Sequence, residues 1–374
     1  MINEITVKSV LRKQKRIDSW FLSSYAINLY RGCSHNCVYC DGRDERYQVD
    51  GDFGRDVSIK SNAIELLSRE LNPARKRKPF QGGFMMVCGG VSDSYQHFEK
   101  ELGMTRKTLE LLLEYGHPVH MLTKSTLIER DLDLLSELRR ERGAVVSFSF
   151  SSVDDNLSRL LEPGVPAPSA RLDAIRRFKD AGFSCGMYLM PVVPFITDSA
   201  EMIEESVCRA KEAGVDFILF SGMTLKPGRQ KDYFLEFIRD EFPSELAALE
   251  RLYSNNSPWG EPSSAGPYHA ERYFSAAASK HRMPRRMPAG IWAPLVSRSE
   301  EIVLVLEQLE YLASLAGHNS PYGKAAWTLA GLGQPIESMS FEELCSLRGI
   351  GSFTAKLVRE IAETGRCGYY EKLL

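Results

Sequence analysis

RGCSHNCVYC, residues 31–40, is the stretch that decides how this chain is interpreted, because it gathers three of the eight cysteines within eight residues. Cys33, Cys37 and Cys40 form the spacing C-x3-C-x2-C. Cysteine thiolates are the usual protein ligands of iron–sulfur clusters. Because three cysteines leave one iron of a 4Fe-4S cube without a protein ligand, the spacing predicts a cluster with one open iron that binds a second molecule.

A structural zinc site and an accidental group of thiols are the alternatives. Zinc usually takes four ligands, often as two C-x2-C pairs, and the sequence has no second pair. His35, inside the loop, is the candidate for a fourth zinc ligand. Ligand count and spacing favour the iron–sulfur cluster over both alternatives.

Length and composition indicate an ordinary globular protein. The 374 residues are 43% hydrophobic and 26% charged, which is typical of globular chains. The formal net charge is −2, so any contact with nucleic acid requires local basic patches. No run approaches the ~20 apolar residues of a membrane span, and no apolar signal segment is visible. Because the cysteines also lack the spacing of a disulfide framework, we expect a cytoplasmic protein.

Residues 25–225 alternate between short apolar runs and amphipathic stretches, a pattern that predicts an α/β fold with a parallel sheet. The intervening helices are expected to end near glycines 116, 143, 182 and 214. In parallel β/α barrels the active site forms at the C-terminal ends of the strands, and the cysteine loop follows the first strand there. The six predicted strands are residues 25–30, 84–88, 118–122, 146–152, 185–193 and 217–220.

The segments outside this alternation suggest three further parts. Residues 1–24 are expected to form a solvated basic arm, and an ordered edge that contacts a polyanion is the alternative. Residues 226–290 contain a Pro-, Ser- and Asn-rich stretch and are expected to form a mostly irregular cap or linker. Residues 291–374 are expected to form a helical C-terminal region.

The sequence LRGIGSFTA, residues 347–355, resembles the helix-hairpin-helix module of DNA repair and replication proteins. We expect a short helix, a tight turn and a second helix within residues 340–364. Gly349 and Gly351 permit a turn whose backbone N–H groups face a phosphate at a helix N-terminus. Lys356 adds a positive charge. The alternative is a hairpin used for packing or for protein interaction.

The cysteine spacing resembles the signature of radical S-adenosylmethionine (SAM) enzymes, and further blocks resemble the spore photoproduct lyase-like family. In the block VSDSYQHFE, Ser92, Ser94 and His97 depart from the usual form of that family. The resemblance implies a partial (β/α)6 TIM-type barrel in which the open iron chelates SAM and an electron cleaves it to a 5′-deoxyadenosyl radical. It also implies an external electron donor such as flavodoxin or ferredoxin. The matching blocks span residues 28–40, 91–99, 122–125, 130–135, 161–164 and 190–198.

The resemblance assigns SAM contacts to residues after the strands. Gly89 and Gly90 match backbone that holds the SAM amino group. Lys124, in LTKS, matches a lysine near the SAM carboxylate or ribose, with a solvated strand-end lysine as the alternative. Ser149 is favoured over its alternating neighbour Ser151 as the inward, SAM-contacting serine.

Two further assignments carry explicit alternatives. Arg171 is expected to contact the SAM carboxylate or to be a surface arginine at a helix start. Cys88 is expected to donate a hydrogen atom to the product radical, as a cysteine at this strand end does in spore photoproduct lyase. A two-residue offset from the lyase pattern leaves a buried core thiol as the alternative for Cys88.

These patterns together predict a radical SAM enzyme that acts on nucleic acid, with a damaged pyrimidine in DNA as the favoured substrate. DNA is favoured over RNA. A radical SAM enzyme that modifies RNA, a peptide or a small molecule is one alternative. A nucleic-acid-binding protein with a structural or redox-sensing cluster is the other.

Overall fold

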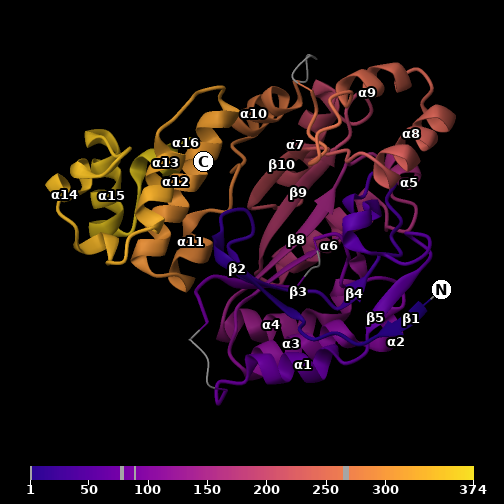
Figure 1. Cartoon of the computed structure of the whole chain (residues 1–374), viewed down its shortest axis with the longest axis horizontal. Helices are drawn as coiled ribbons and strands as arrows, with labels where there is room; N and C mark the ends of the chain where they lie inside the picture. Colours follow the sequence, from indigo (N-terminus) through magenta and orange to yellow (C-terminus); the bar gives the residue numbers. More distant parts are fainter. Residues whose placement is uncertain (1, 76–79, 88–89, 264–268) are drawn as a thin grey trace.

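A curled, seven-stranded sheet forms the centre of the molecule in a computed structural model, which describes residues 2–75, 80–87, 90–263 and 269–374 (Figure 1). From one edge to the other, its strands are β10 (Phe217–Gly222), β9 (Ser184–Val192), β8 (Ala144–Phe150), β7 (Val119–Thr123), β6 (Phe84–Val87), β3 (Ser23–Ile27) and β2 (Leu11–Asp18). The six strands from β10 to β3 are parallel to one another, and β2 is an antiparallel edge strand. The predicted partial (β/α)6 barrel is confirmed.

Helices cover the outer face of this sheet. Side chains alternate along a strand, so Val146, Phe148 and Phe150 of β8 point outward. There they join one apolar cluster with Leu135 and Ile175 of the covering helices. These helices are α1 (Ala63–Leu71), α3 (Met104–Glu114), α4 (Leu132–Glu141), α6 (Pro168–Asp180), α7 (Ala200–Glu212) and α10 (Ala270–His281).

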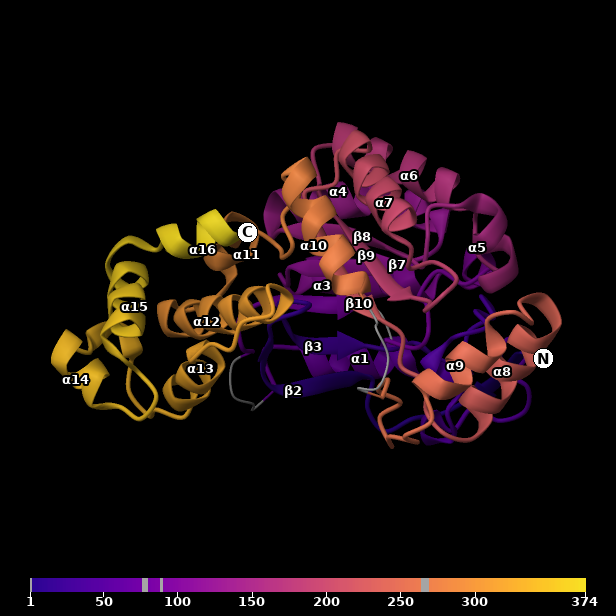
Figure 2. The same cartoon turned by 90° about the horizontal axis from the view of Figure 1, so that it is seen from above.

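The C-terminal helices cover the inner face at the N-terminal ends of the strands. Val145 of β8 and Tyr188 of β9 point inward and share a second apolar cluster with Leu306 of α12 (Arg298–Leu315). The Tyr311 hydroxyl donates to the Phe220 carbonyl at 3.2 Å. Figure 2 shows α12 reaching from the other C-terminal helices to the sheet. The others are α11 (Ala289–Trp292), η4 (Ala293–Leu295), α13 (Tyr322–Ala330), η5 (Ile336–Ser338), α14 (Phe341–Ser346), α15 (Ser352–Thr364) and α16 (Gly368–Leu373).

Strands occupy much of residues 1–24, so the expected solvated arm is wrong. β1 (Ile2–Ile5) pairs in parallel with β5 (Val57–Lys60), which also pairs with β4 (Tyr30–Arg31) in a separate three-stranded sheet. β2 belongs to the main sheet. Buried Val10 and Ile17 anchor the segment, whereas its basic side chains stay exposed. These exposed residues are Lys8, Arg12, Lys13, Lys15 and Arg16.

Helices also occupy much of residues 226–290, where we expected a mostly irregular cap. α8 (Arg229–Glu241) buries Phe234 and Ile238, and α10 buries Phe274 and Ala278. Each pair is four residues apart, so each helix buries one face. A third helix, α9 (Leu246–Leu252), lies between them, and the Pro-, Ser- and Asn-rich stretch is confined to the connection from α9 to α10.

The remaining helices are short: η1 (Asp41–Arg43), η2 (Glu45–Tyr47), α2 (Glu99–Leu102), η3 (Thr126–Asp131) and α5 (Asp155–Leu161). Of these, α2, η3 and α5 lie in connections from a strand to a longer helix, and η1 and η2 lie between β4 and β5. Across the described ranges, no helix has both the length and the apolar character that crossing a membrane requires.

The hairpin near the C-terminus has the predicted local structure. α14 and α15 flank a turn in which Gly349 has a φ of +87°, a conformation that favours glycine. Ile350 is buried in the second apolar cluster and anchors the turn. Gly351 is the N-cap of α15, and Lys356 is exposed on that helix. Phosphate binding by this hairpin stays a prediction.

Candidate active site

The three clustered cysteines lie in the loop between β4 and η1, beyond the C-terminal end of β3. Cys33 and Cys37 are buried, and Cys40 is half-buried. Gly32 starts the loop with a φ of +85°, and a Cβ there would lie 2.7 Å from the carbonyl oxygen of Asp56. The turn therefore requires glycine, and it directs the chain so that three thiols gather at the predicted end of the barrel.

The environment of these thiols disfavours isolated thiolates. Burial raises the pKa of Cys33 well above its usual range, and it also raises the pKa values of Cys37 and Cys40. A thiolate at such a position requires a nearby positive charge, which metal ions supply when they bind. The three thiols therefore fit a cluster whose irons bring that charge.

Residues 91–97 hold the cysteine loop through hydrogen bonds. The Ser92 hydroxyl donates to the Gly32 carbonyl at 2.8 Å, and the Ser34 backbone N–H donates to Gln96 Oε1 at 2.6 Å. His97 Nδ1 lies 3.0 Å from Ser34 Oγ. Ser92 and His97, which depart from the usual family pattern, therefore have a structural role in holding the loop.

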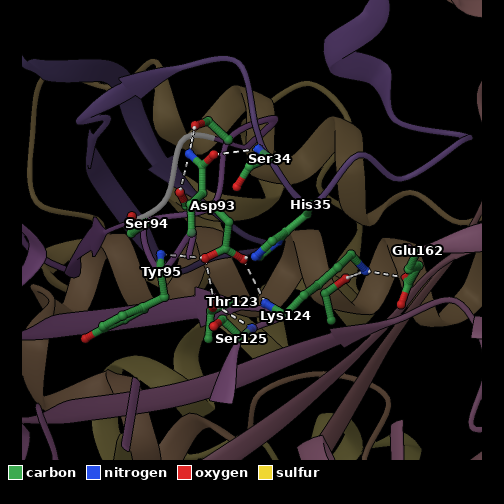
Figure 3. Close-up of polar contacts among 12 residues, drawn as sticks. Ser34, His35, Asp93, Ser94, Tyr95, Thr123, Lys124, Ser125 and Glu162 are labelled. Carbon is green, nitrogen blue, oxygen red and sulfur yellow. Dashed lines mark hydrogen bonds and ion pairs between the residues drawn. The ribbon is translucent and has the colours of Figure 1, made fainter. Parts of the chain in front are cut away.

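Asp93 joins the cysteine loop to the end of β7 (Figure 3). Its carboxylate accepts hydrogen bonds from the Tyr95 backbone N–H at 2.7 Å, the Thr123 hydroxyl at 2.7 Å and the Lys124 backbone N–H at 2.8 Å. His35 Nδ1 lies 3.5 Å from the same carboxylate. Sequence reasoning quoted Asp93 within a motif but assigned it no role.

The zinc alternative makes His35 a fourth ligand, but in the structure its Nδ1 lies 3.5 Å from the Asp93 carboxylate. Its ring is buried against Asp93, and burial lowers the pKa of the imidazole. Among the residues that the structure describes, no three Cys, His, Asp or Glu side chains are grouped as ligands of one metal ion. A 4Fe-4S cube instead takes each thiolate on a different iron.

Glu162 is the centre of a buried charge network beside the cysteines. Its carboxylate lies 2.7 Å from Arg171 Nη2 and 3.0 Å from Lys124 Nζ, and it accepts a hydrogen bond from the Tyr39 hydroxyl. Burial alone would raise the pKa of Glu162. Arg171 and Lys124 outweigh that effect and hold this pKa well below its usual range. Glu162 therefore stays charged and orients both cations.

The loop that carries Glu162 packs directly on the cysteine loop. The Val38 backbone N–H donates to the Leu161 carbonyl at 2.9 Å, and the Gly164 N–H donates to the His35 carbonyl at 3.0 Å. A Cβ on Gly164 would lie 2.5 Å from the Ser34 carbonyl oxygen. The LEPG block is therefore a contact surface for the cluster loop, which the linear sequence did not indicate.

Residues after β10 close the other side of the cysteine loop. Lys226 pairs with Asp41 of η1, and the Gln230 amide donates to the Tyr39 carbonyl at 3.0 Å. The guanidinium of Arg43 lies over the Tyr233 ring, 3.5 Å from its centroid. Sequence reasoning missed these contacts, because no motif marks residues 226–233.

A cavity of about 520 Å³ lies between the cysteine loop and the inner face of the sheet. Cys37 and Cys40 line one side of it. Leu122 and Met190 also line it and pack against the second apolar cluster. The apolar side chains of that cluster, which include those of α12, therefore close the cavity on the side of the strands' N-terminal ends. Small-molecule and cofactor sites have this size.

The structure brings three of the predicted SAM-contacting residues to the cavity. Gly90, Lys124 and Ser149 line it, and the Lys124 ammonium donates to Ser149 Oγ at 2.8 Å. Ser149, the favoured serine, therefore faces the cavity, whereas Ser151 is not in its described lining, and Lys124 is not a solvated lysine. Cys88 and Gly89 lie outside the described residues, so their roles stay predictions.

Arg171 differs from both expectations for it. Its side chain is fully buried, which rules out a surface arginine. The guanidinium donates to Ser158, Glu162 and the Ser149 carbonyl, and Arg171 is absent from the described lining of the cavity. Its geometry is that of a residue that positions Glu162, and the SAM contact stays a prediction.

Comparison with known proteins gives the following similarities. Residues 27–207 match the sequence profile of the radical SAM superfamily. An uncharacterized protein of Mycobacterium bovis is 31% identical over 265 residues, which cover 70% of this chain and 76% of that protein. An uncharacterized protein of Methanocaldococcus jannaschii is 28% identical over 57% of this chain and 76% of its own length.

Two solved structures share the fold. One is a spore photoproduct lyase complexed with dinucleoside spore photoproduct, with a TM-score of 0.51 and 15% identity. The other is a mutant of spore photoproduct lyase with bound AdoMet and the same dinucleoside, with a TM-score of 0.51 and 16% identity. Each alignment covers 75% of this chain and 79% of the other.

Proposed function

Because the chain belongs to the radical SAM superfamily and is an enzyme that uses a 4Fe-4S cluster and SAM, we propose that its substrate is nucleic acid, with a damaged pyrimidine in DNA favoured. The observation that carries this proposal is the cavity, which has cluster thiols on one side and the basic strand β2 on its rim. The shared fold of lyases that bind a dinucleoside lesion supports it.

The residues around the cavity have separable tasks. Cys33, Cys37 and Cys40 hold the cluster through their thiolates. When bound, the cluster and SAM supply a 5′-deoxyadenosyl radical that abstracts a hydrogen atom, with the electron coming from an external donor of the flavodoxin or ferredoxin type.

The chain positions SAM and keeps water away. We assign the SAM amino group to the backbone at Gly90 and its neighbour Gly89, and the carboxylate or ribose to Lys124 and Ser149. Glu162 holds the Lys124 ammonium at 3.0 Å, so the lysine meets SAM already oriented. The apolar floor below the cavity keeps the radical from side reactions with water.

Two parts of the proposal concern the substrate. We assign to Cys88 the donation of a hydrogen atom to the product radical. We assign to the hairpin the binding of a phosphate of the nucleic-acid backbone, through Gly349, Gly351 and Lys356. Such a contact carries no base specificity, so it anchors the strand while the damaged base leaves the stack to reach the cavity.

Anaerobic incubation with SAM, dithionite and UV-damaged oligonucleotides tests this function. Mass spectrometry should show conversion of the lesion together with 5′-deoxyadenosine. Cys37→Ala is the control, because it lacks a cluster ligand and should give neither product. SAM cleavage with every damaged DNA and RNA oligonucleotide unchanged would refute the nucleic-acid substrate while leaving the enzyme class intact.

A further inference from the structure

Strand β2 concentrates positive charge at an edge of the barrel. Its sequence, LRKQKRID, has four basic residues and one acidic residue. In the main sheet β2 pairs with β3 alone, so its outer edge takes no part in the described ladder. Edge strands often carry lysines that discourage aggregation, which is the purely structural explanation for these charges.

The alternation of side chains along β2 places its cations in different surroundings. Arg12 lines the cavity. Arg16, four residues further on, forms an ion pair with Glu307 of α12 at 2.8 Å. Lys13 lies on the opposite side, with its ammonium 5.9 Å from the centroid of the Tyr25 ring. In the described part of the chain, no hydrogen bond or ion pair engages the Arg12 side chain.

The other charged residues that line the cavity are neutralised by neighbours. Lys124 Nζ lies 3.0 Å from Glu162, and Asp41 pairs with Lys226. Among the described lining residues, Arg12 therefore carries the uncompensated charge. Prevention of aggregation does not require an arginine directed into a cavity.

We propose that Arg12 anchors the substrate by binding a backbone phosphate of a nucleic-acid strand that lies along β2, an inference that rests on the proposed nucleic-acid substrate. The planar guanidinium forms paired, charge-assisted hydrogen bonds with phosphate oxygens. A cavity of about 520 Å³ is a small-molecule site rather than a channel for a duplex, so the reacting nucleoside enters while its phosphate stays at the rim. Arg12 is a positioning residue, because it touches the backbone and not the reacting base.

Arg12→Gln and Lys13→Gln provide a matched test. Both remove one positive charge from exposed, adjacent positions of the same strand, on opposite faces. The probe is a fluorescently labelled, UV-damaged single-stranded oligonucleotide, titrated against cluster-loaded protein over a range of salt concentrations. Arg12→Gln should weaken binding roughly tenfold at low salt, and it should reduce the slope of log affinity against log salt by about 0.7, the value for one phosphate. Lys13→Gln should reduce both much less.

Each other result contradicts the inference in an identifiable way. Absence of wild-type binding at low salt refutes the nucleic-acid substrate and this inference with it. Wild-type binding with equal losses in the two variants refutes the role of Arg12 alone and leaves the substrate class standing. Weaker SAM binding by Arg12→Gln without oligonucleotide would show that the arginine serves SAM, which also overturns the proposal.

Discussion

On the barrel's inner face, the two ends of the same strands differ. The N-terminal ends, called the lower end, pack mainly apolar side chains against α12, and the C-terminal ends, called the upper end, carry the polar and charged groups of the site. On β7, His120 is buried and contacts Ser147, whereas Leu122, and Lys124 just after the strand, line the cavity. On β8, Val145 belongs to the apolar cluster with α12, whereas Ser149 meets the Lys124 ammonium. Alternation selects the face of the sheet, and position along the strand selects between packing and chemistry, with chemistry at the C-terminal ends.

This difference separates stability from function. The lower end removes apolar surface from water, which is the main favourable term in folding. The upper end buries Glu162 between Arg171 and Lys124, and burying charges costs free energy that their attraction offsets only when the geometry is good. Buried charges in place of an apolar core are expected at functional sites.

Loss of a cluster ligand should have the largest effect and should be confined to the upper end. Cys33→Ala, Cys37→Ala and Cys40→Ala should each abolish the intact cube, because each thiolate binds a different iron. Iron analysis after anaerobic reconstitution should fall from about four irons per wild-type chain, and 5′-deoxyadenosine formation should stop. Cys345→Ala, at an exposed cysteine, is the control. Wild type that holds zinc and takes up no iron would contradict the assignment.

Glu162→Gln should give the next largest effect, because it leaves Arg171 and Lys124 without their counter-charge. Loss of one partner of a buried ion pair costs about 3–5 kcal/mol, so the free energy of unfolding in urea should fall by about that amount. Glu137→Gln removes an exposed carboxylate from α4, 4.0 Å from Arg140, and should cost less than about 0.5 kcal/mol. Similar losses in the two variants would remove the distinction between the buried network and the surface.

The pH dependence of the free energy of unfolding should report on His120, which is buried at the lower end. Burial lowers the pKa of His120 to about 4, and its Nε2 lies 2.9 Å from Ser147 Oγ. In the unfolded chain the histidine has its ordinary pKa near 6.5, so between that pH and about 4 the unfolded chain binds a proton at His120 and the folded chain does not. The free energy of unfolding should therefore fall as pH decreases from about 6.5 to about 4, by roughly 3 kcal/mol from this group.

The measurement is the difference in that pH dependence between wild type and His120→Gln, taken from urea unfolding at several pH values. The variant lacks the titrating ring, so it should lose less stability over this range than wild type does. Parallel curves for the two proteins would show that His120 is protonated without cost.

The smallest expected effect concerns the SAM contact of Lys124. Lys124→Ala removes one charged hydrogen-bond donor from the cavity and should weaken SAM binding about tenfold, or about 1.4 kcal/mol, with the cluster retained. Equilibrium binding to the reconstituted variant measures this loss. Lys107→Ala, at an exposed lysine of α3, is the control. Wild-type affinity in Lys124→Ala would show that its ammonium serves Glu162 and Ser149 alone.

The cluster site and the barrel could be predicted from the sequence, because both depend on short-range patterns. Cys33, Cys37 and Cys40 lie within a single loop, and their spacing carries the ligand count by itself. Each strand reveals itself through its own apolar residues, and four of the helices, α3, α4, α6 and α7, end near a glycine. Alternation along β8 places Ser149 on the inner face but gives Ser151 the same face, so only the structure separated the two serines, by placing Ser149 in the lining of the cavity.

Two segments were predicted wrongly where long-range packing overrides local composition. The first 24 residues contain a basic run, yet Val10 and Ile17 are buried and strands form. Residues 226–290 contain helices whose apolar positions matter only because the barrel and cysteine loop lie next to them. Composition describes the average surroundings of a segment, and it does not specify the surface against which that segment packs.

The sequence by itself determined the strand–helix alternation and the cofactor class, and it singled out Cys33, Cys37 and Cys40 as the candidate cluster ligands. Only the tertiary structure decided that Glu162 would meet Tyr39, 123 residues away, that Arg16 would pair with Glu307, and that Arg12 would face the cavity unpaired. The physical reason is that ligand spacing and periodicity are properties of neighbouring residues. A charge network depends on distances in space, which exist only after the sheet has curled and its loops have met.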